Sequence, residues 1–138
     1  MTVKEALERD VYYNRPGVVI VRWDTTLQAV YVETQGWADP TESRESLDAV
    51  LRALTEHHGS RWLVDGRNMK VIQQTDQDWI SENWLPRALA AGLRRTAMVM
   101  PKSGLATMNV DDMAARAPDS QIDFRFFSTI EKATEWLV

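Results

Sequence analysis

The chain has 138 residues and a mass of 15.8 kDa, so we expect a single domain over residues 1–138. A net charge of −4, from 16 basic and 20 acidic residues, argues against general nucleic-acid binding, which needs a basic face. No apolar run approaches the roughly 18–20 residues that span a bilayer, and the absence of cysteine excludes disulfides and thiolate chemistry. These properties predict a cytoplasmic protein with no membrane span and no nucleic-acid partner.

The first part of the chain predicts an antiparallel hairpin. Residues 18–24 and 29–34 are rich in β-branched and aromatic side chains, and a polar segment separates them. A weaker strand over residues 11–13 precedes them, with Pro16-Gly17 as the turn.

A helix is predicted to follow the hairpin. Asp39 can accept hydrogen bonds from the first free amides, Pro40 suits the first helical position, and Glu42 completes a capping box. Apolar residues at positions 47, 50, 51 and 54 then share one helix face. We expect Gly59 to end this helix in the left-handed conformation.

Strand-then-helix units recur along the rest of the chain. The predicted strands cover residues 61–65, 96–100 and 122–127, and the predicted helices cover residues 76–91, about 104–116 and 129–137. Thr75 and Ser128 are the expected caps of the first and last of these helices. Four βα units imply right-handed crossovers, so the sequence predicts an α/β fold with a mixed, mostly parallel sheet and an antiparallel hairpin at its N-terminal edge.

Pro86 falls inside the predicted helix 76–91. Its ring removes one amide donor and clashes with the carbonyl four residues back, so a kink or break is expected near Asn83. The break changes the direction in which Trp79 and Trp84 point relative to the rest of the helix.

Signatures of catalysis are absent from the sequence. It contains no nucleotide-binding glycine pattern and no nucleophile elbow, and its only histidines are the adjacent His57 and His58 at the end of the first predicted helix. Neighbouring helical residues point about 100° apart, so we favour helix capping over a metal site or acid–base catalysis for this pair. The sequence therefore predicts a non-enzymatic protein with no metal ion and no cofactor.

The richest cluster of candidate binding residues follows the strand 61–65. Ligands of open α/β sheets bind beyond the carboxyl ends of strands, where Asp65, Arg67 and Asn68 stand. Trp79 and Trp84 could supply an aromatic wall. The five residues are thus a candidate ligand site, in which Arg67 is expected to add little stability as an exposed arginine. Structural anchoring of the loop and a protein-binding surface stay open as alternatives.

The run from Trp62 to Asn68, followed by Asp78-Trp79-Ile80 and the segment 84–88, resembles the small bacterial STAS-like (SpoIIAA-like) proteins. Residues 130–137 resemble the C-terminal helix of that family. The resemblance covers about residues 18–138 and implies a mixed sheet with helices joined by right-handed crossovers. The wider superfamily includes anti-sigma-factor antagonists and relatives of CRAL-TRIO lipid-binding domains.

The chain departs from the antagonist pattern at one place. Those proteins carry a phosphorylatable serine where a helix follows a central strand, whereas residues 65–68 contain no serine or threonine. The resemblance therefore implies a non-catalytic regulatory or protein-interaction module without that phosphoswitch. The alternative is a small-molecule or lipid-binding domain with a pocket at the end of strand 61–65.

Six tryptophans are more than one small core needs, and the hairpin leaves a sheet edge to protect. We therefore expect a homodimer. A further protein or a small apolar ligand is the other expected partner.

Overall fold

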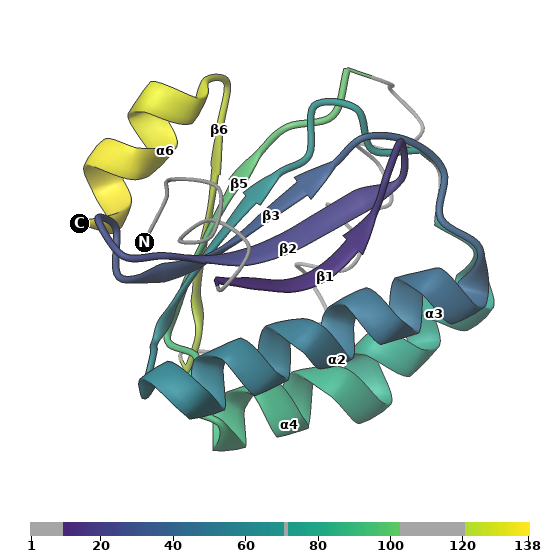
Figure 1. Ribbon diagram of the computed structural model, residues 1–138, viewed down its shortest axis with the longest axis horizontal. Coiled ribbons are helices and arrows are strands. Elements are labelled where there is room, and N and C mark those ends of the chain that lie inside the picture. Colours follow the sequence, from purple (N-terminus) through teal and green to yellow (C-terminus); the bar gives the residue numbers. More distant parts are fainter. Residues whose placement is uncertain (1–9, 71, 103–120) are drawn as a thin grey trace.

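A six-stranded mixed sheet forms the centre of the computed structural model, which describes residues 10–70, 72–102 and 121–138 (Figure 1). Its strands are β1 (Val11–Arg15), β2 (Val19–Asp24), β3 (Ala29–Thr34), β4 (Arg61–Asp65), β5 (Arg95–Val99) and β6 (Asp123–Phe127). They lie side by side in chain order. The pairings among β1, β2 and β3 are antiparallel, and those from β3 to β6 are parallel. The predicted α/β fold with an N-terminal antiparallel hairpin is confirmed.

Helices cover both faces of the sheet, as Figure 1 shows. One face carries the long helix α2 and a segment that consists of α3, the π-helical turn η1 and α4, and the other face carries α6. Their bounds are α2 (Pro40–His57), α3 (Gln74–Trp79), η1 (Ile80–Trp84), α4 (Leu85–Ala90) and α6 (Ile130–Leu137). The helix predicted at about 104–116 lies outside the described residues. Within the described residues, no helix is both long enough and apolar enough to cross a membrane.

Strand β4 separates two apolar clusters because alternate side chains of a strand point to opposite faces. Trp62 and Val64 pack in the cluster on the face of α2 and α4. Leu63 packs in the cluster beneath α6, with Ala133 and Leu137 of that helix. A short strand that is buried on both sides therefore holds the two helical layers together.

Helix α2 begins as predicted and ends one residue earlier than predicted. The backbone N–H of Glu42 donates to Asp39 Oδ1 (2.7 Å) and the Glu42 carboxylate accepts from the Asp39 N–H (3.2 Å), so the capping box is confirmed. The prediction for Gly59 is wrong, because His58 takes the left-handed conformation, with φ of 50°. Gly59 is needed for space instead: a Cβ atom there would lie 2.8 Å from the Trp23 ring.

Two other predicted caps are wrong by one or two positions. Helix α3 begins after Gln73, whose side chain makes no capping hydrogen bond, and not after Thr75. Helix α6 begins after Thr129, whose hydroxyl accepts from the Lys132 N–H (3.2 Å), and not after Ser128. The cap is the residue whose backbone stays extended, and composition does not distinguish it among adjacent polar residues.

The break expected from Pro86 is present. The helical segment widens into the π turn η1, in which the Leu85 N–H bonds to the carbonyl of Ile80, five residues back. Pro86 then lies in the first turn of α4, where backbone N–H groups have no acceptor within the helix, so its missing N–H costs no helical hydrogen bond. The extra residue of the π turn rotates α4 relative to α3.

The capping box gives a prediction about stability. Replacing Asp39 with alanine (Asp39→Ala) removes the acceptor for the Glu42 N–H, so the free energy of unfolding should fall by about 1 kcal/mol. Urea denaturation measures this change. Asp48→Ala on the same helix is the control, because the Asp48–Arg87 ion pair is about half exposed on both sides and such pairs contribute little. An equal loss in the two variants would contradict the capping role.

Candidate functional site

A partly open, mostly apolar cavity of about 130 Å³ lies between the sheet and the first turns of α2 and α3. Four strands contribute to its wall at the end of the sheet where the parallel strands finish. The apolar side chains that line it include Val18, Val19, Val32, Trp37, Leu47, Trp62, Val64, Met69, Ile80 and Met98. The polar side chains that line it are Thr34, Ser43, Ser46, Lys70, Gln73 and Asp76. An apolar chamber with a few polar groups is the usual composition of a small-molecule site.

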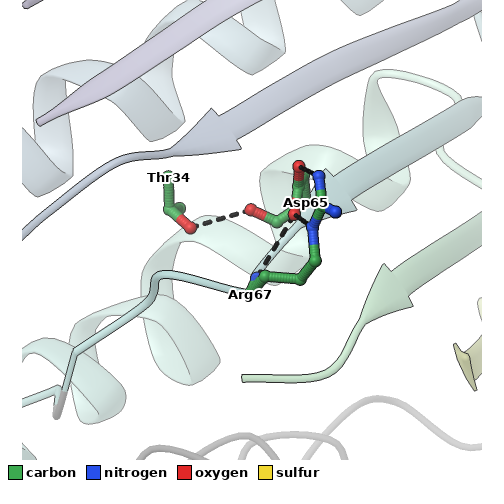
Figure 2. A network of polar contacts seen from close by, with 3 residues as sticks. All are labelled: Thr34, Asp65 and Arg67. Carbon is green, nitrogen blue, oxygen red and sulfur yellow. Dashed lines mark hydrogen bonds and ion pairs between the residues drawn. The ribbon is translucent and has the colours of Figure 1, made fainter. Parts of the chain in front are cut away.

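A separate polar network occupies the loop that leaves β4 (Figure 2). The guanidinium of Arg67 holds the carboxylate of Asp65 in two parallel hydrogen bonds, from Nε to Oδ1 (2.9 Å) and from Nη2 to Oδ2 (2.7 Å). The Arg67 backbone N–H also donates to Oδ1 (3.3 Å), and the Thr34 hydroxyl donates to the Asp65 carbonyl (2.8 Å). Hydrogen bonds within the loop, between Arg67 and Asp65, thus fix its shape, and the bond from Thr34 holds it against β3.

The ion pair is asymmetric in its exposure. The Asp65 side chain is 6% exposed, whereas that of Arg67 is 49% exposed. The hydrogen bonds from Arg67 lower the pKa of Asp65 below its usual value, against the opposing effect of burial. The carboxylate is therefore held charged by Arg67, and the outer edge of the guanidinium faces solvent.

Gly66 holds this loop against the neighbouring strand. Its N–H donates to the carbonyl of Val99 at the end of β5 (3.0 Å), and a Cβ atom on residue 66 would lie 2.7 Å from that oxygen. Any other residue would force the loop away from β5. The Lys102 N–H in turn donates to the Arg67 carbonyl (3.2 Å).

The cavity and the ion pair lie at the same end of the sheet but on opposite faces. Val64 lines the cavity, so the next residue, Asp65, points toward the α6 face. The pair interacts electrostatically with groups on that face: Tyr31 of β3 interacts with both Asp65 and Arg67, and Glu131 of α6 interacts with Arg67. None of the five candidate residues of the sequence analysis lines the cavity.

The structure places the remaining three candidates in different surroundings. Asn68 is exposed. Trp84 is fully buried, its indole N–H donates to the Leu47 carbonyl (2.8 Å), and its ring packs on Trp62 with centroids 5.0 Å apart. Trp79 is half-buried, with the guanidinium of Arg44 5.2 Å and that of Arg87 5.6 Å from its ring centroid.

Asp65 and Arg67 are thus brought together, and the two tryptophans lie apart from them. A ligand-binding role for these five residues stays a prediction.

Sequence reasoning missed the cavity residues, and one signal could have found some of them. The alternation along β4 assigns Trp62 and Val64 to the same face and Asp65 to the other. Asp76, by contrast, reads from the sequence as an ordinary acid in the first turn of a helix. Its position on the cavity wall depends on how α3 packs on the sheet.

The two histidines have structural surroundings. His57 stacks on the Trp23 ring, with centroids 4.2 Å apart and planes within 1° of parallel, and His58 is the left-handed cap of α2. In the described part of the chain, no group of three or more His, Asp or Glu side chains could hold a metal ion.

Comparison with known proteins gives one match. A model of the SpoIIAA-like family matches residues 29–138, which include the wall of the cavity from Val32 onward and the loop after β4. No curated protein and no solved structure matches the chain significantly.

The ion pair changes the stability expected from Arg67. Removing the guanidinium (Arg67→Ala) leaves a buried carboxylate with a single backbone donor, so we expect the free energy of unfolding at pH 7 to fall by about 1 kcal/mol, the half-exposed position of Arg67 limiting the loss. Urea denaturation measures it. Arg125→Ala is the control, because Arg125 and Asp123 are likewise two residues apart in sequence and form an ion pair (3.4 Å) whose side chains are 57% and 48% exposed.

The loss should depend on pH. Since the pKa of Asp65 in the folded chain lies below its ordinary value of 3.8, the stability that the pair contributes is complete above that value and is lost as the pH falls through the folded pKa. Wild type and Arg67→Ala should therefore converge in stability below about pH 4. A difference that stays constant from pH 7 to pH 3 would show that Arg67 acts through packing and not through the carboxylate.

Proposed function

The chain belongs to the SpoIIAA-like family, and from this premise we propose that it is a non-catalytic STAS-type domain that binds a small, mostly apolar molecule in the cavity between the sheet and helices α2 and α3. The observation that carries the proposal is the cavity itself. It lies at the carboxyl ends of the parallel strands, where ligands of α/β sheets bind.

The size and lining of the cavity support a ligand about as large as one aromatic ring. Its volume is about 130 Å³, and an apolar cavity of about 150 Å³ in another protein binds benzene. Valine, methionine and tryptophan side chains make up much of the wall. Methionine side chains adapt their shape to a ligand at little cost, so Met69 and Met98 suit a chamber that fills and empties.

The polar groups around the cavity support binding and not catalysis. Among the described residues that line the cavity, Asp76 is the one carboxylate and none is a histidine. A nucleophile with an adjacent base, which covalent or acid–base chemistry requires, is not formed by the lining residues.

We also propose that regulation by this domain does not use phosphorylation of the loop after β4. Residues 65–68 carry no hydroxyl group. A phosphate there would also lie beside the buried carboxylate of Asp65, which like-charge repulsion disfavours. Occupancy of the cavity is the alternative signal.

Filling the cavity tests the proposal. Ser43 lies on the wall in the first turn of α2, so Ser43→Leu should place apolar atoms in the chamber and weaken the binding of toluene at least about ten-fold. Titration of methyl-labelled protein with toluene reports binding: the methyl signals of Met69 and Met98 should shift and saturate, with a dissociation constant near about 1 mM.

Two controls accompany this titration. The methyl signal of Met100, which does not line the cavity, should shift little. Thr41→Leu changes an exposed residue in the same helical turn and should bind toluene as the wild type does. If wild-type signals show no saturation up to the solubility of toluene, the cavity does not take apolar ligands and the proposal fails.

A second candidate function is a protein-interaction module, and Trp37 favours it. The residue is 55% exposed at the rim of the cavity, and large exposed aromatic side chains are typical of binding surfaces. β1 and β6, the outer strands of the described sheet, are further places for contact. We propose that a second copy of this chain is the partner.

Self-association at Trp37 predicts a measurable mass difference. Sedimentation equilibrium at high micromolar concentration should give a mass above 15.8 kDa for the wild type. Trp37→Ser should move the equilibrium toward the monomer, because it removes the exposed apolar contact. If the wild type sediments only as a 15.8 kDa species, self-association is excluded at these concentrations.

A further inference from the structure

Three arginines on neighbouring strands gather toward the amino ends of the parallel strands, away from the cavity. Arg61 and Arg95 are the first residues of β4 and β5 and pair in register, and Arg125 of β6 pairs in register with Ala97. Alternation along β4 puts Arg61 on the same face as Leu63, which packs beneath α6. The cavity wall belongs to the other face of the sheet, so this cluster is separate from the site described above.

Trp136 of α6 contacts two of these guanidiniums. The Cζ atom of Arg95 lies 5.1 Å and that of Arg125 5.0 Å from the centroid of the Trp136 ring, and Arg95 Nη1 donates to the Trp136 carbonyl (3.3 Å). The guanidinium of Arg61 donates to the Leu27 carbonyl (3.2 Å). Stacking and hydrogen bonds to carbonyls orient the three side chains without removing their charge. We refer to Arg61, Arg95, Arg125 and Trp136 as the arginine patch.

The charge of the arginine patch is only partly balanced. Arg125 Nε lies 3.4 Å from the Asp123 carboxylate, in an ion pair whose side chains are both about half exposed. Among the described residues, no carboxylate forms an ion pair with Arg61 or Arg95. Like charges on neighbouring strands repel each other, so this arrangement costs stability. In a chain of net charge −4, an excess of positive charge on one surface indicates an acidic partner.

A second cluster of arginine and tryptophan in the same chain has balanced charges. Trp79 also lies beneath two guanidiniums, those of Arg44 (5.2 Å) and Arg87 (5.6 Å). Arg44 is paired there with Asp76 at 3.7 Å. Arg87 is paired with Asp48 at 3.2 Å. Stacking on tryptophan therefore does not require unpaired charge, and the shortage of carboxylates in the arginine patch has another cause.

We propose that the arginine patch is a docking surface for another protein, which presents two or three acidic side chains in a short extended segment. A guanidinium offers a carboxylate two parallel hydrogen bonds, so arginine suits this recognition better than lysine. Neighbouring strands are about 4.8 Å apart, so the three strands that carry the arginines span about 10 Å, the length of about three extended residues. Guanidiniums that already stack on Trp136 lose little freedom on binding, which lowers its entropic cost.

The charge distribution favours a protein partner over a nucleic acid. Nucleic acids bind to extended basic faces that neutralise many phosphates, whereas the arginine patch has three cationic side chains. The net charge of −4 also repels a long polyanion. A short acidic segment gains the local attraction and escapes most of that repulsion, because surface charges beyond about 10 Å are screened at moderate salt.

Binding of a fluorescein-labelled oligoglutamate peptide, followed by fluorescence anisotropy, tests this docking surface. Oligoglutamine of the same length is the uncharged control. At about 20 mM salt, where screening is weak, we expect oligoglutamate to bind the wild type with a dissociation constant below about 1 mM, and oligoglutamine not to bind measurably. Raising the salt to about 150 mM should weaken the binding several-fold.

Single variants that remove one charge locate the binding surface. Arg95→Gln and Arg125→Gln should each weaken oligoglutamate binding at least about three-fold. Arg44→Gln and Arg87→Gln change the net charge by the same amount in the balanced cluster, and each should stay within about two-fold of the wild type. Asp123→Asn should strengthen binding, because it removes the carboxylate that competes for Arg125.

The outcome at Arg125 decides between docking and a structural role. Its side chain is 57% exposed, and Arg125→Gln leaves the hydrogen bond from Arg95 to α6 in place, so this variant tests binding even if Arg95→Gln fails to fold. If the wild type does not bind oligoglutamate at about 20 mM salt, or if all four arginine variants weaken it equally, the inference is wrong. A short single-stranded RNA that binds more tightly than oligoglutamate, and that loses affinity in Arg125→Gln, would also overturn it.

Discussion

The two-sided burial of strand β4 is the constraint on which the rest of this structure depends. Four of its five residues are buried, because β4 lies between β3 and β5 and is covered by helices on both faces. Trp62 and Val64 point to one helical layer and Leu63 to the other, so a shift of one residue in register would exchange the two cores. The strand therefore has one compatible register.

The same alternation decides what stands at the end of β4. Asp65 continues the series toward the α6 face, where burial of a carboxylate requires a partner, and Arg67 provides it in two hydrogen bonds. Val64 continues the series toward α2 and α3, and its side chain lines the cavity on that face. An ion pair and an apolar cavity thus lie on opposite faces of the sheet at the carboxyl end of β4. They are separated because consecutive residues of a strand, here Val64 and Asp65, point to opposite faces.

The π turn η1 determines how the second helical layer fits. Pro86 prevents an unbroken helix, and the chain accommodates it with one extra residue before α4. Trp84, the last residue of η1, reaches the core between Trp62 and the carbonyl of Leu47 in α2. Trp79, on the other side of the turn, stays at the surface beneath two arginines. Two aromatic residues that are five positions apart therefore have different roles: one joins the layers and the other covers the outside of the helix.

Local sequence determined the elements and the class of fold. The hairpin follows from two runs of β-branched residues, the start of α2 from Asp39, Pro40 and Glu42, and the break in the second helix from Pro86, because each of these signals acts through the backbone within a few residues. Burial of strand β5 on both faces follows in the same way from its continuous apolar run. Caps were misplaced by a residue or two, since adjacent polar residues compete for one backbone conformation.

Only the tertiary structure decided which of the candidate residues share a site. The sequence grouped Asp65, Arg67 and Asn68 with Trp79 and Trp84 by proximity along the chain, whereas the two faces of β4 separate the ion pair from the cavity. The wall of that cavity comes from four strands and two helix starts, and no spacing rule connects Val18 with Asp76 or Trp62 with Ser43. Empty space between elements is a property of how their surfaces fit together. It is not encoded by any single segment, which is why the cavity became visible only in the folded chain.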